Sequence, residues 1–394
     1  MTEGTSTEQQ PKVLFTITEE HLDTGLRGYP VGHCRTSAVS PDLGVTYVGY
    51  TLWDLADLPG EDVVYLLLEK ELPTPEQARA FKDEMARRSA IDPRVFDALR
   101  ALPKDGHPME WLIAGLALLG MTGKTNDFRE DARNLIARIS TLVAAIYRIR
   151  EGWGDPIAPR HDLPLHENFV HMLGMDDASP VLADLLRLFY VLHMDHGGGN
   201  LSTFVGKSVA SGKADMYASI ASAMAALYGP RHGRANQECL QFVKSIGTSE
   251  KAAVEKRVRG ILDSGGLVFG FGHAVLRQED PRAKIQYAFG QEHFPENELV
   301  KTALALREVV PPILKENPKI ANPYPNVDAV SGSLLTAAGL TDPEYYTLLF
   351  GWSRVAGIAA QIVDERIVPG KKDGFPIYRP KYIAQGQPPR ERAK

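Results

Sequence analysis

The stretch from Val181 to Met194 constrains the fold more strongly than any other, because it is apolar on almost every side of a helix. Only Asp184, Arg187 and His193 interrupt its apolar residues. A helix with this pattern must be covered by neighbouring elements on most of its sides. The sequence therefore predicts a large helical core with this segment inside it.

Helical patterns fill most of the chain from about Trp53 onward. Thr74 and Pro75 are typical of an N-cap and a first helical position, so a helix is expected from there to about Ser89. The short β-branched runs 13–17 and 45–50 predict a small strand-and-turn region instead. Further helices are expected at 109–119, 127–150, 216–227, 249–262, 297–315, 329–338 and 343–367.

The succession of these helices predicts an all-α fold with two domains. Residues 13–235 and 339–394 are expected to form a large helical domain, because the apolar helical pattern of the first part resumes at Pro343. Residues 236–338 are expected to form a smaller, inserted helical domain, and residues 1–12 a disordered tail. A cleft between two such domains is a common place for a ligand.

Charge and composition argue against several classes of function. The chain has 44 Lys and Arg against 49 Asp and Glu, a net charge of −5, so we expect no nucleic acid as partner. No apolar run reaches the length that spans a membrane, so we expect no membrane either. The two cysteines are far apart, and the first residues are acidic and polar, unlike a signal or transit peptide. These features predict a cytoplasmic protein.

Glycines frame three histidines in polar turns or loops, namely His196, His232 and His273. Around His273, the segment 265–282 also carries Arg277 and Arg282. Glycines let the backbone come close to a ligand, and arginines bind carboxylate or phosphate groups. His196 follows the buried helix, whose dipole is expected to stabilise its charged form. Each histidine alone fits an ordinary cap or turn equally well, but together they indicate an anionic substrate.

Three further charged residues are less decisive by themselves. Asp328 precedes the helix 329–338, and an aspartate at an N-cap usually has a lowered pKa. Arg354 lies in an apolar helix, where a lone charge is costly unless a bound anion or an internal carboxylate pairs with it. Arg379, in the polar tail, would be solvated.

Two nucleotide-binding motifs and a metal site fail on spacing. Gly270 and Gly272 begin a G-x-G sequence, but Val275 occupies the place of its third glycine. Gly123–Thr125 resembles the end of a phosphate loop, but Leu118 occupies the place of the first glycine. A set of histidines lacks both an H-E-x-x-H pattern and a cysteine partner, so we expect no metal: His161, His166, His171, His193 and His196.

Five segments, in this order, resemble the citrate synthase family. They are D-H-G-G-G-N (195–200), G-P-R-H-G-R-A-N-Q-E (229–238), G-F-G-H-A-V-L-R-Q-E-D-P-R (270–282), N-P-Y-P-N-V-D-A-V-S-G (322–332) and F-G-W-S-R-V-A-G (350–357). The wording G-H-A-V-L-R is similar to the type found in mitochondria and some bacteria, and the similarity extends from about residue 13 to about residue 385. The resemblance implies an all-α homodimer that closes on its substrate. It also implies condensation of acetyl-CoA with oxaloacetate to give citrate and CoA, without a metal or other cofactor.

The resemblance further implies a role for each matching residue. His232, His273 and Asp328 match the catalytic residues: Asp328 as base, neutral His232 as donor to the thioester oxygen, and His273 as the group that polarises the ketone. The residues that match oxaloacetate ligands are His196, Arg282, Arg354 and Arg379, the last reaching into the partner's site. Arg277 and Lys319 match contacts of coenzyme A.

Two departures and three alternatives accompany this assignment. Arg231 stands where the family usually has an apolar residue, and the connection between Arg354 and Arg379 is longer than is usual in the family. The nearest alternative is a 2-methylcitrate synthase, which uses propionyl-CoA with the same residues. The others are a metal-dependent hydrolase and a non-catalytic or assembly protein with the same fold. The intact set of His232, His273 and Asp328 argues against the last of these.

Overall fold

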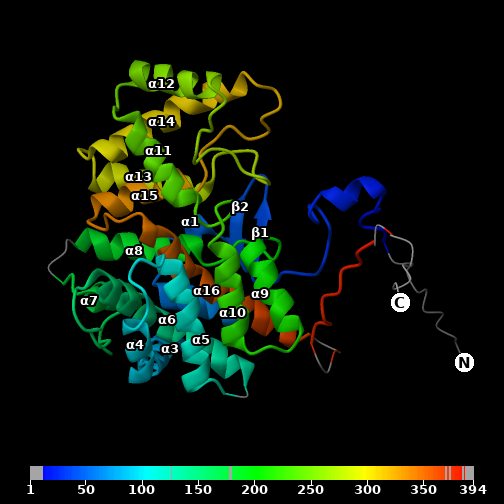
Figure 1. The fold of residues 1–394 in the computed structure, drawn as a ribbon, viewed down its shortest axis with the longest axis vertical. Coiled ribbons are helices and arrows are strands. Elements are labelled where there is room, and N and C mark those ends of the chain that lie inside the picture. The colour runs from blue at the N-terminus through cyan, green and yellow to red at the C-terminus, as the bar shows by residue number, and fades with distance from the viewer. Residues whose placement is uncertain are drawn as a thin grey trace, which may run out of the picture.

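A computed structural model describes residues 12–125, 127–176, 180–368, 371, 374–383 and 386. Helices make up most of the described chain, which confirms the expected all-α fold (Figure 1). The predicted disordered tail lies outside the described residues, except for Lys12. The helices are a short 3-10 helix (Glu19–Asp23), α1 (Leu52–Leu55), α2 (Gly60–Glu69), α3 (Pro75–Arg88), α4 (Pro93–Arg100), α5 (Pro108–Gly123), α6 (Phe128–Glu151), α7 (Leu165–Leu173), α8 (Pro180–His193), α9 (Leu201–Ser211), α10 (Met216–Leu227), α11 (Ala235–Ile246), α12 (Lys251–Asp263), α13 (Pro281–His293), α14 (Glu298–Lys315), α15 (Asp328–Ala337) and α16 (Glu344–Arg366).

A small antiparallel sheet in the order β1-β2-β3 precedes the α-helices. Its strands are β1 (Ser37–Ser40), β2 (Gly44–Tyr47) and β3 (Tyr50–Thr51), with Ser37 opposite Tyr47. The strand expected at 45–50 is therefore confirmed in part, whereas residues 13–17 form none. Val13 and Ile17 are 78% and 63% exposed, so these β-branched residues have no neighbouring strand or core to pack against.

Two helices are enclosed by the rest of the large core. In α8, Leu185, Leu186 and Tyr190 are at most 1% exposed, which confirms the burial expected from its apolar pattern. α16 is enclosed over an even longer stretch and contacts α2, α5, α6, α8, α9, α10 and α11. Its Trp352 is fully buried and donates a hydrogen bond from Nε1 to Ser140 Oγ at 2.8 Å. α16 is thus the axis of the large core (Figure 1).

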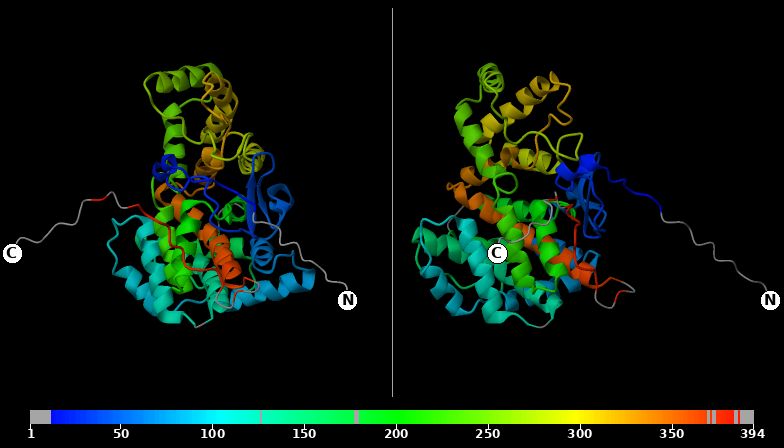
Figure 2. Two further views of the ribbon diagram at one scale, coloured as in Figure 1. Left: turned by 90° about the vertical axis from the view of Figure 1, so that its right-hand side faces the viewer. Right: turned by 45° about the vertical axis from the view of Figure 1, so that its right-hand side comes forward.

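A second cluster of buried apolar side chains lies where α11, α12 and α14 meet, and includes Phe242, Val258 and Val310. These helices form the upper part of the molecule (Figures 1 and 2). α13 and α15, from the same stretch of sequence, instead contribute Tyr287 and Leu334 to the large core. The boundaries 236–338 of a small domain therefore stay a prediction.

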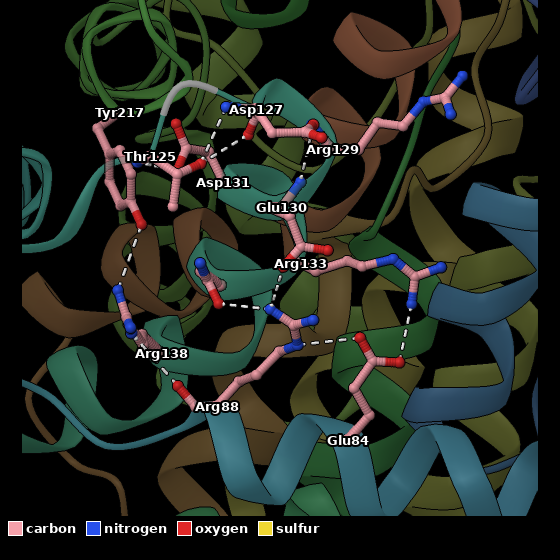
Figure 3. A network of polar contacts seen from close by, with 11 residues as sticks. Glu84, Arg88, Thr125, Asp127, Arg129, Glu130, Asp131, Arg133, Arg138 and Tyr217 are labelled. Carbon is pink, nitrogen blue, oxygen red and sulfur yellow. Dashed lines mark hydrogen bonds and ion pairs between the residues drawn. The ribbon is translucent and has the colours of Figure 1, made fainter.

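A network of ion pairs joins α3 to α6 on one side of the large core (Figure 3). Arg88 contacts Glu84 on its own helix at 2.9 Å and Glu130 of α6 at 2.8 Å. Arg133 of α6 contacts the other oxygen of Glu84 at 2.9 Å. Single exposed pairs contribute little, but charges that share partners hold two helices in one alignment. We assign this network a structural role.

Among the described residues, no helix has both the length and the apolar character needed to cross a bilayer.

Candidate active site

The loop that carries His273 is fastened to the proline-rich run before α15. Phe271 and Pro325 form an isolated antiparallel bridge, and Asn326 N–H donates to the carbonyl of Gly270 at 2.9 Å. Gly270 has φ +81°, and a Cβ there would lie 2.6 Å from Cys239 Sγ and 2.8 Å from Ala329 Cα. Only glycine satisfies both the conformation and the close approach. These contacts hold the histidine loop directly against the start of α15.

Backbone donors fix the tautomer of His273. Its Nδ1 accepts hydrogen bonds from the N–H groups of Val275 at 3.1 Å and Leu276 at 3.0 Å. The proton of the neutral ring therefore lies on Nε2. Burial lowers the pKa of His273, and the charge of Arg282 lowers it further. His273 is thus a neutral ring that donates a hydrogen bond from Nε2.

His232 is fixed in the opposite tautomer. The N–H of Ser202, in the first turn of α9, donates to His232 Nε2 at 3.2 Å, and Ser202 Oγ lies 2.9 Å from the same atom. Nδ1 therefore carries the proton. Burial, followed by the charge of Arg354, lowers the pKa of His232 to about 4. Arg231 is exposed, so its unusual charge faces solvent.

His196 lies beside His273, with 5.4 Å between the ring centroids. Burial lowers its pKa well below the usual value, and the charges of Arg282 and Arg354 lower it further. The charged form expected from the dipole of α8 is therefore wrong. Two buried guanidinium groups and the loss of water outweigh a helix terminus, whose effect is at most about 2 kcal/mol.

Arg282 forms a buried two-point ion pair. Its Nε lies 3.0 Å from Asp280 Oδ1 and its Nη2 lies 2.7 Å from Asp280 Oδ2. Arg282 is 2% exposed and Asp280 is fully buried. Burial alone would raise the pKa of Asp280, but the adjacent Arg282 outweighs burial and lowers it. The pair is thus shielded from solvent on both sides.

Arg354 is a buried cation without a carboxylate. It is 2% exposed, its Nε donates to the carbonyl of His193 at 2.8 Å, and the guanidinium lies 4.6 Å from the centre of the Phe350 ring. No Asp or Glu of the described chain lies within ion-pair distance of it. Burial lowers its pKa to about 10. Of the two partners expected for this residue, the structure favours a bound anion.

Asp328 is the first residue of α15, one position after the N-cap Val327. Among the described residues, no group donates a hydrogen bond to its carboxylate. Burial raises its pKa to about 6, while Arg282 and Arg354 lower it and Asp280 raises it. The lowered pKa expected for an N-cap aspartate is therefore wrong. A carboxylate with this pKa is suited to accept a proton near neutral pH.

Six of the residues singled out in the sequence thus meet in one region: His196, His232, His273, Arg282, Asp328 and Arg354. The other three lie on the surface of the molecule. Arg277 donates from Nη1 to the carbonyls of Val275 and Leu276, and Lys319 is exposed. Arg379 is exposed in the segment 374–383. In the described chain, His, Cys, Asp and Glu form no group that could hold a metal ion.

Three residues that support the site were not singled out from the sequence: Asp195, Ser202 and Asp280. Asp195 and Asp280 stand inside the segments that carry the resemblance, next to residues that were selected. Ser202 has no such signal, since its contact with His232 spans 30 positions in the chain.

The family model described as "Citrate synthase, C-terminal domain" matches residues 25–381. The chain belongs to the citrate synthase family. It is 38% identical to the mitochondrial citrate synthase of Daucus carota over 399 residues, covering 94% of this chain and 83% of the relative. It is 35% identical to the peroxisomal citrate synthase of Saccharomyces cerevisiae, covering 92% and 84%.

Solved structures of citrate synthases have the same fold. The enzyme of Pyrobaculum aerophilum superimposes with a TM-score of 0.83 at 29% identity, covering 94% of each chain. The enzyme of Thermoplasma acidophilum, in a ternary complex with carboxymethyl coenzyme A and oxaloacetate, has a TM-score of 0.83 at 26% identity, covering 94% of this chain and 98% of that one.

Family membership makes this chain an enzyme, an acyltransferase of the citrate synthase type, and sets aside the metal-dependent hydrolase and the non-catalytic protein. It also supports a reaction without a cofactor, in which acetyl-CoA is a substrate. The expectation of a cytoplasmic protein is wrong, because the relatives are named mitochondrial or peroxisomal. Net charge and the composition of the first residues do not determine the compartment of a protein.

Proposed function

We propose that this member of the citrate synthase family uses acetyl-CoA in preference to propionyl-CoA, and that Arg354 and the five residues gathered with it perform the reaction. The observation that carries the assignment of these residues is that one region holds a carboxylate whose pKa is raised and two neutral histidines of opposite tautomer. The relatives named citrate synthase support acetyl-CoA as the acyl donor.

Oxaloacetate is the proposed anionic partner of Arg354. Its two carboxylates match the buried guanidinium groups of Arg354 and Arg282, because arginine binds carboxylates through two parallel hydrogen bonds. Arg282 keeps Asp280 as a partner, whereas Arg354 has no carboxylate partner in the described chain. We therefore assign Arg354 the larger share of oxaloacetate binding. His196, beside His273, lies within the same region.

The reaction starts with removal of a proton from the acetyl methyl group by Asp328. A carboxylate can remove so weakly acidic a proton only where the enolate oxygen is stabilised as it forms. His232 supplies that hydrogen bond from Nδ1–H, which its contact with Ser202 leaves free. The ring is neutral, since its pKa is about 4.

The enol carbon then attacks the ketone carbon of oxaloacetate. His273 Nε2–H faces the substrate, because Nδ1 is occupied by the N–H groups of Val275 and Leu276. As the carbon–carbon bond forms, this N–H donates a hydrogen bond to the alkoxide that develops on the ketone oxygen. The alkoxide takes up a proton from water while Asp328 releases the methyl proton to water, so His273 stays neutral. Water then cleaves the thioester of citryl-CoA, which yields citrate and CoA. Arg277 and Lys319, both exposed cations, are proposed contacts of the phosphate groups of coenzyme A.

We further propose a homodimer in which Arg379 enters the partner's site. Two exposed arms support it, 13–31 near the start and 379–383 near the end of the described chain; both extend from the body of the molecule (Figures 1 and 2). They expose Leu14 at 73%, Tyr382 at 91% and Ile383 at 63%. Apolar arms of this kind are typical of segments that are covered by a second subunit.

Release of the CoA thiol tests the proposed acyl donor. The kcat/KM for acetyl-CoA is expected to exceed that for propionyl-CoA, and both releases should depend on oxaloacetate. One methylene in an apolar pocket changes the rate only by about 10- to 200-fold, so some propionyl-CoA turnover is expected. Faster release from propionyl-CoA would instead identify a 2-methylcitrate synthase with the same catalytic residues.

A further inference from the structure

Lys207 of α9 is a buried cation in the large core, behind the loop that carries His196. It is 5% exposed, and its Nζ lies 2.9 Å from Glu365 Oε1 and 3.2 Å from Gln361 Oε1. Glu365 is 8% exposed. A buried ion pair adds little net stability, because both charges lose their hydration. Its presence next to a ligand site therefore suggests a role in positioning.

Lys207 fixes the orientation of the Gln361 amide. A lysine ammonium can only donate hydrogen bonds, so the oxygen of the amide must face Lys207 and its nitrogen must face the other way. On that side, Gln361 Nε2 donates to Asp195 Oδ1 at 2.7 Å and to the carbonyl of Gly197 at 3.2 Å. The amide thus holds the residues immediately before and after His196.

Asp195 is the point at which the loop meets α16. Its carboxylate is fully buried and also accepts hydrogen bonds from Thr36 Oγ1 at 2.6 Å and from the N–H of His196 at 2.8 Å. Gly357 allows the contact, because a Cβ there would lie 2.1 Å from the carbonyl oxygen of Met194. The position of His196 therefore depends on this carboxylate and on its donors.

Glu365, the carboxylate partner of Lys207, also contacts the segment that contains Arg379. Glu365 Oε1 accepts a hydrogen bond from the Tyr378 hydroxyl at 3.2 Å, and the carbonyl of Glu365 accepts one from Phe375 N–H at 2.9 Å. Arg379 follows Tyr378 directly. The ion pair between Lys207 and Glu365 thus connects the His196 loop to the segment that contains Arg379.

We propose that Gln361, Lys207 and Glu365 form a positioning relay that holds the His196 loop in its oxaloacetate-binding geometry and connects this loop to the segment carrying Arg379. The proposal rests on the proposed function, because it assigns oxaloacetate to His196. None of the three residues is a catalytic residue, since each acts through Asp195, Gly197 or Tyr378.

Replacement of Gln361 tests the relay. Gln361→Leu is expected to raise the dissociation constant of oxaloacetate at least about tenfold, the effect of losing a hydrogen bond to a charged group. Asn168→Leu is the matched control, because Asn168 is also a buried amide with two hydrogen bonds, here to the backbone of Arg160. Equal oxaloacetate affinity in the two variants would overturn the proposal.

Gln361→Glu separates an effect on positioning from a simple loss of packing, because it keeps the shape of the side chain. It also serves as the second variant if Gln361→Leu fails to fold. The groups facing position 361 are Asp195, Lys207 and, one turn along α16, Glu365. The introduced carboxyl group cannot donate to Asp195 when it is ionised, whereas its protonated form can. The ratio of variant to wild-type dissociation constants is therefore expected to fall as the pH is lowered from 8 to 6. A ratio that does not change with pH would contradict the relay.

Wild-type binding keeps the two proposals distinguishable. If calorimetry detects no oxaloacetate binding by the wild-type enzyme, the proposed function fails. If the wild type binds oxaloacetate and the Gln361 variants bind it equally well, only the relay fails.

Discussion

Burial without a compensating partner sets the protonation states of the candidate catalytic side chains. Asp328 accepts no hydrogen bond in the described chain, so loss of water favours its neutral form and raises its pKa. The same loss of water, together with the charge of Arg354, lowers the pKa of His232 and of His196, so both rings are neutral. The positive charge of Arg354, which has no carboxylate partner in the described chain, is available to bind an anionic substrate.

These protonation states predict a specific dependence of activity on pH. Asp328 must be ionised to accept a proton, and its pKa is about 6, so kcat/KM for acetyl-CoA should rise as the pH increases through about 6. His232, with a pKa of about 4, stays neutral across this range. The measurement is kcat/KM at saturating oxaloacetate between about pH 5 and 8. An unchanged or falling profile would show that Asp328 is not the base.

The bounds of some helices were predictable from local signals, because capping and periodicity act within a few residues. α3 begins at Pro75 after the cap Thr74, and α10 has the expected bounds. The strand expected at 13–17 failed, since β propensity without a partner strand does not make a strand. The region of His196 illustrates the same limit, because its pKa depends on Arg282 and Arg354, which are remote in sequence.

The candidate site was recognisable mainly through its glycine-framed motifs and their order. The motifs identified which side chains to examine, but not their tautomers or partners. Asp280 and Arg282 both stand in one of these motifs, yet their pairing and burial depend on packing against the large core. Gln361 carried no signal, because it stands among apolar residues of α16 and contacts a loop 166 positions away.

The close approach at Gly270 gives a prediction for the loop that holds His273. Gly270→Ala should lower the free energy of unfolding by about 1–3 kcal/mol more than Gly265→Ala, because both have positive φ but only the former clashes, with Cys239 and Ala329. It should also lower kcat, since Ala329 adjoins Asp328. Urea unfolding and thiol release measure the two effects. Equal losses in both variants would show that the contact is unimportant.

At the scale of the whole molecule, the proposed site is incomplete within one subunit if Arg379 acts across the dimer. Arg379 is exposed next to Tyr378, which is hydrogen-bonded to Glu365 of the large core. The exposed arms support a second subunit, which is a proposal about assembly. The two separate core clusters support domain closure, which is a proposal about motion.

Mixed dimers test the crossing of Arg379. Arg379→Ala and Asp328→Asn subunits are each expected to be poorly active. Co-expression should restore about a quarter of wild-type activity, because half of randomly formed dimers have one intact site. If Arg379 acted within its own subunit, both sites of every mixed dimer would lack one residue, and activity would not return. Arg379→Ala expressed alone is the control.

Oxaloacetate-dependent release of thiol from acetyl-CoA by the Asp328→Asn variant tests the central claim most directly. The variant keeps the shape of the side chain but cannot accept the proton, so kcat should fall by about 100- to 10,000-fold. Asp215→Asn is the matched control, because Asp215 caps α10 and asparagine caps helices equally well. Turnover near the wild-type rate in Asp328→Asn, or an equal loss in Asp215→Asn, would contradict the assignment of Asp328 as the base.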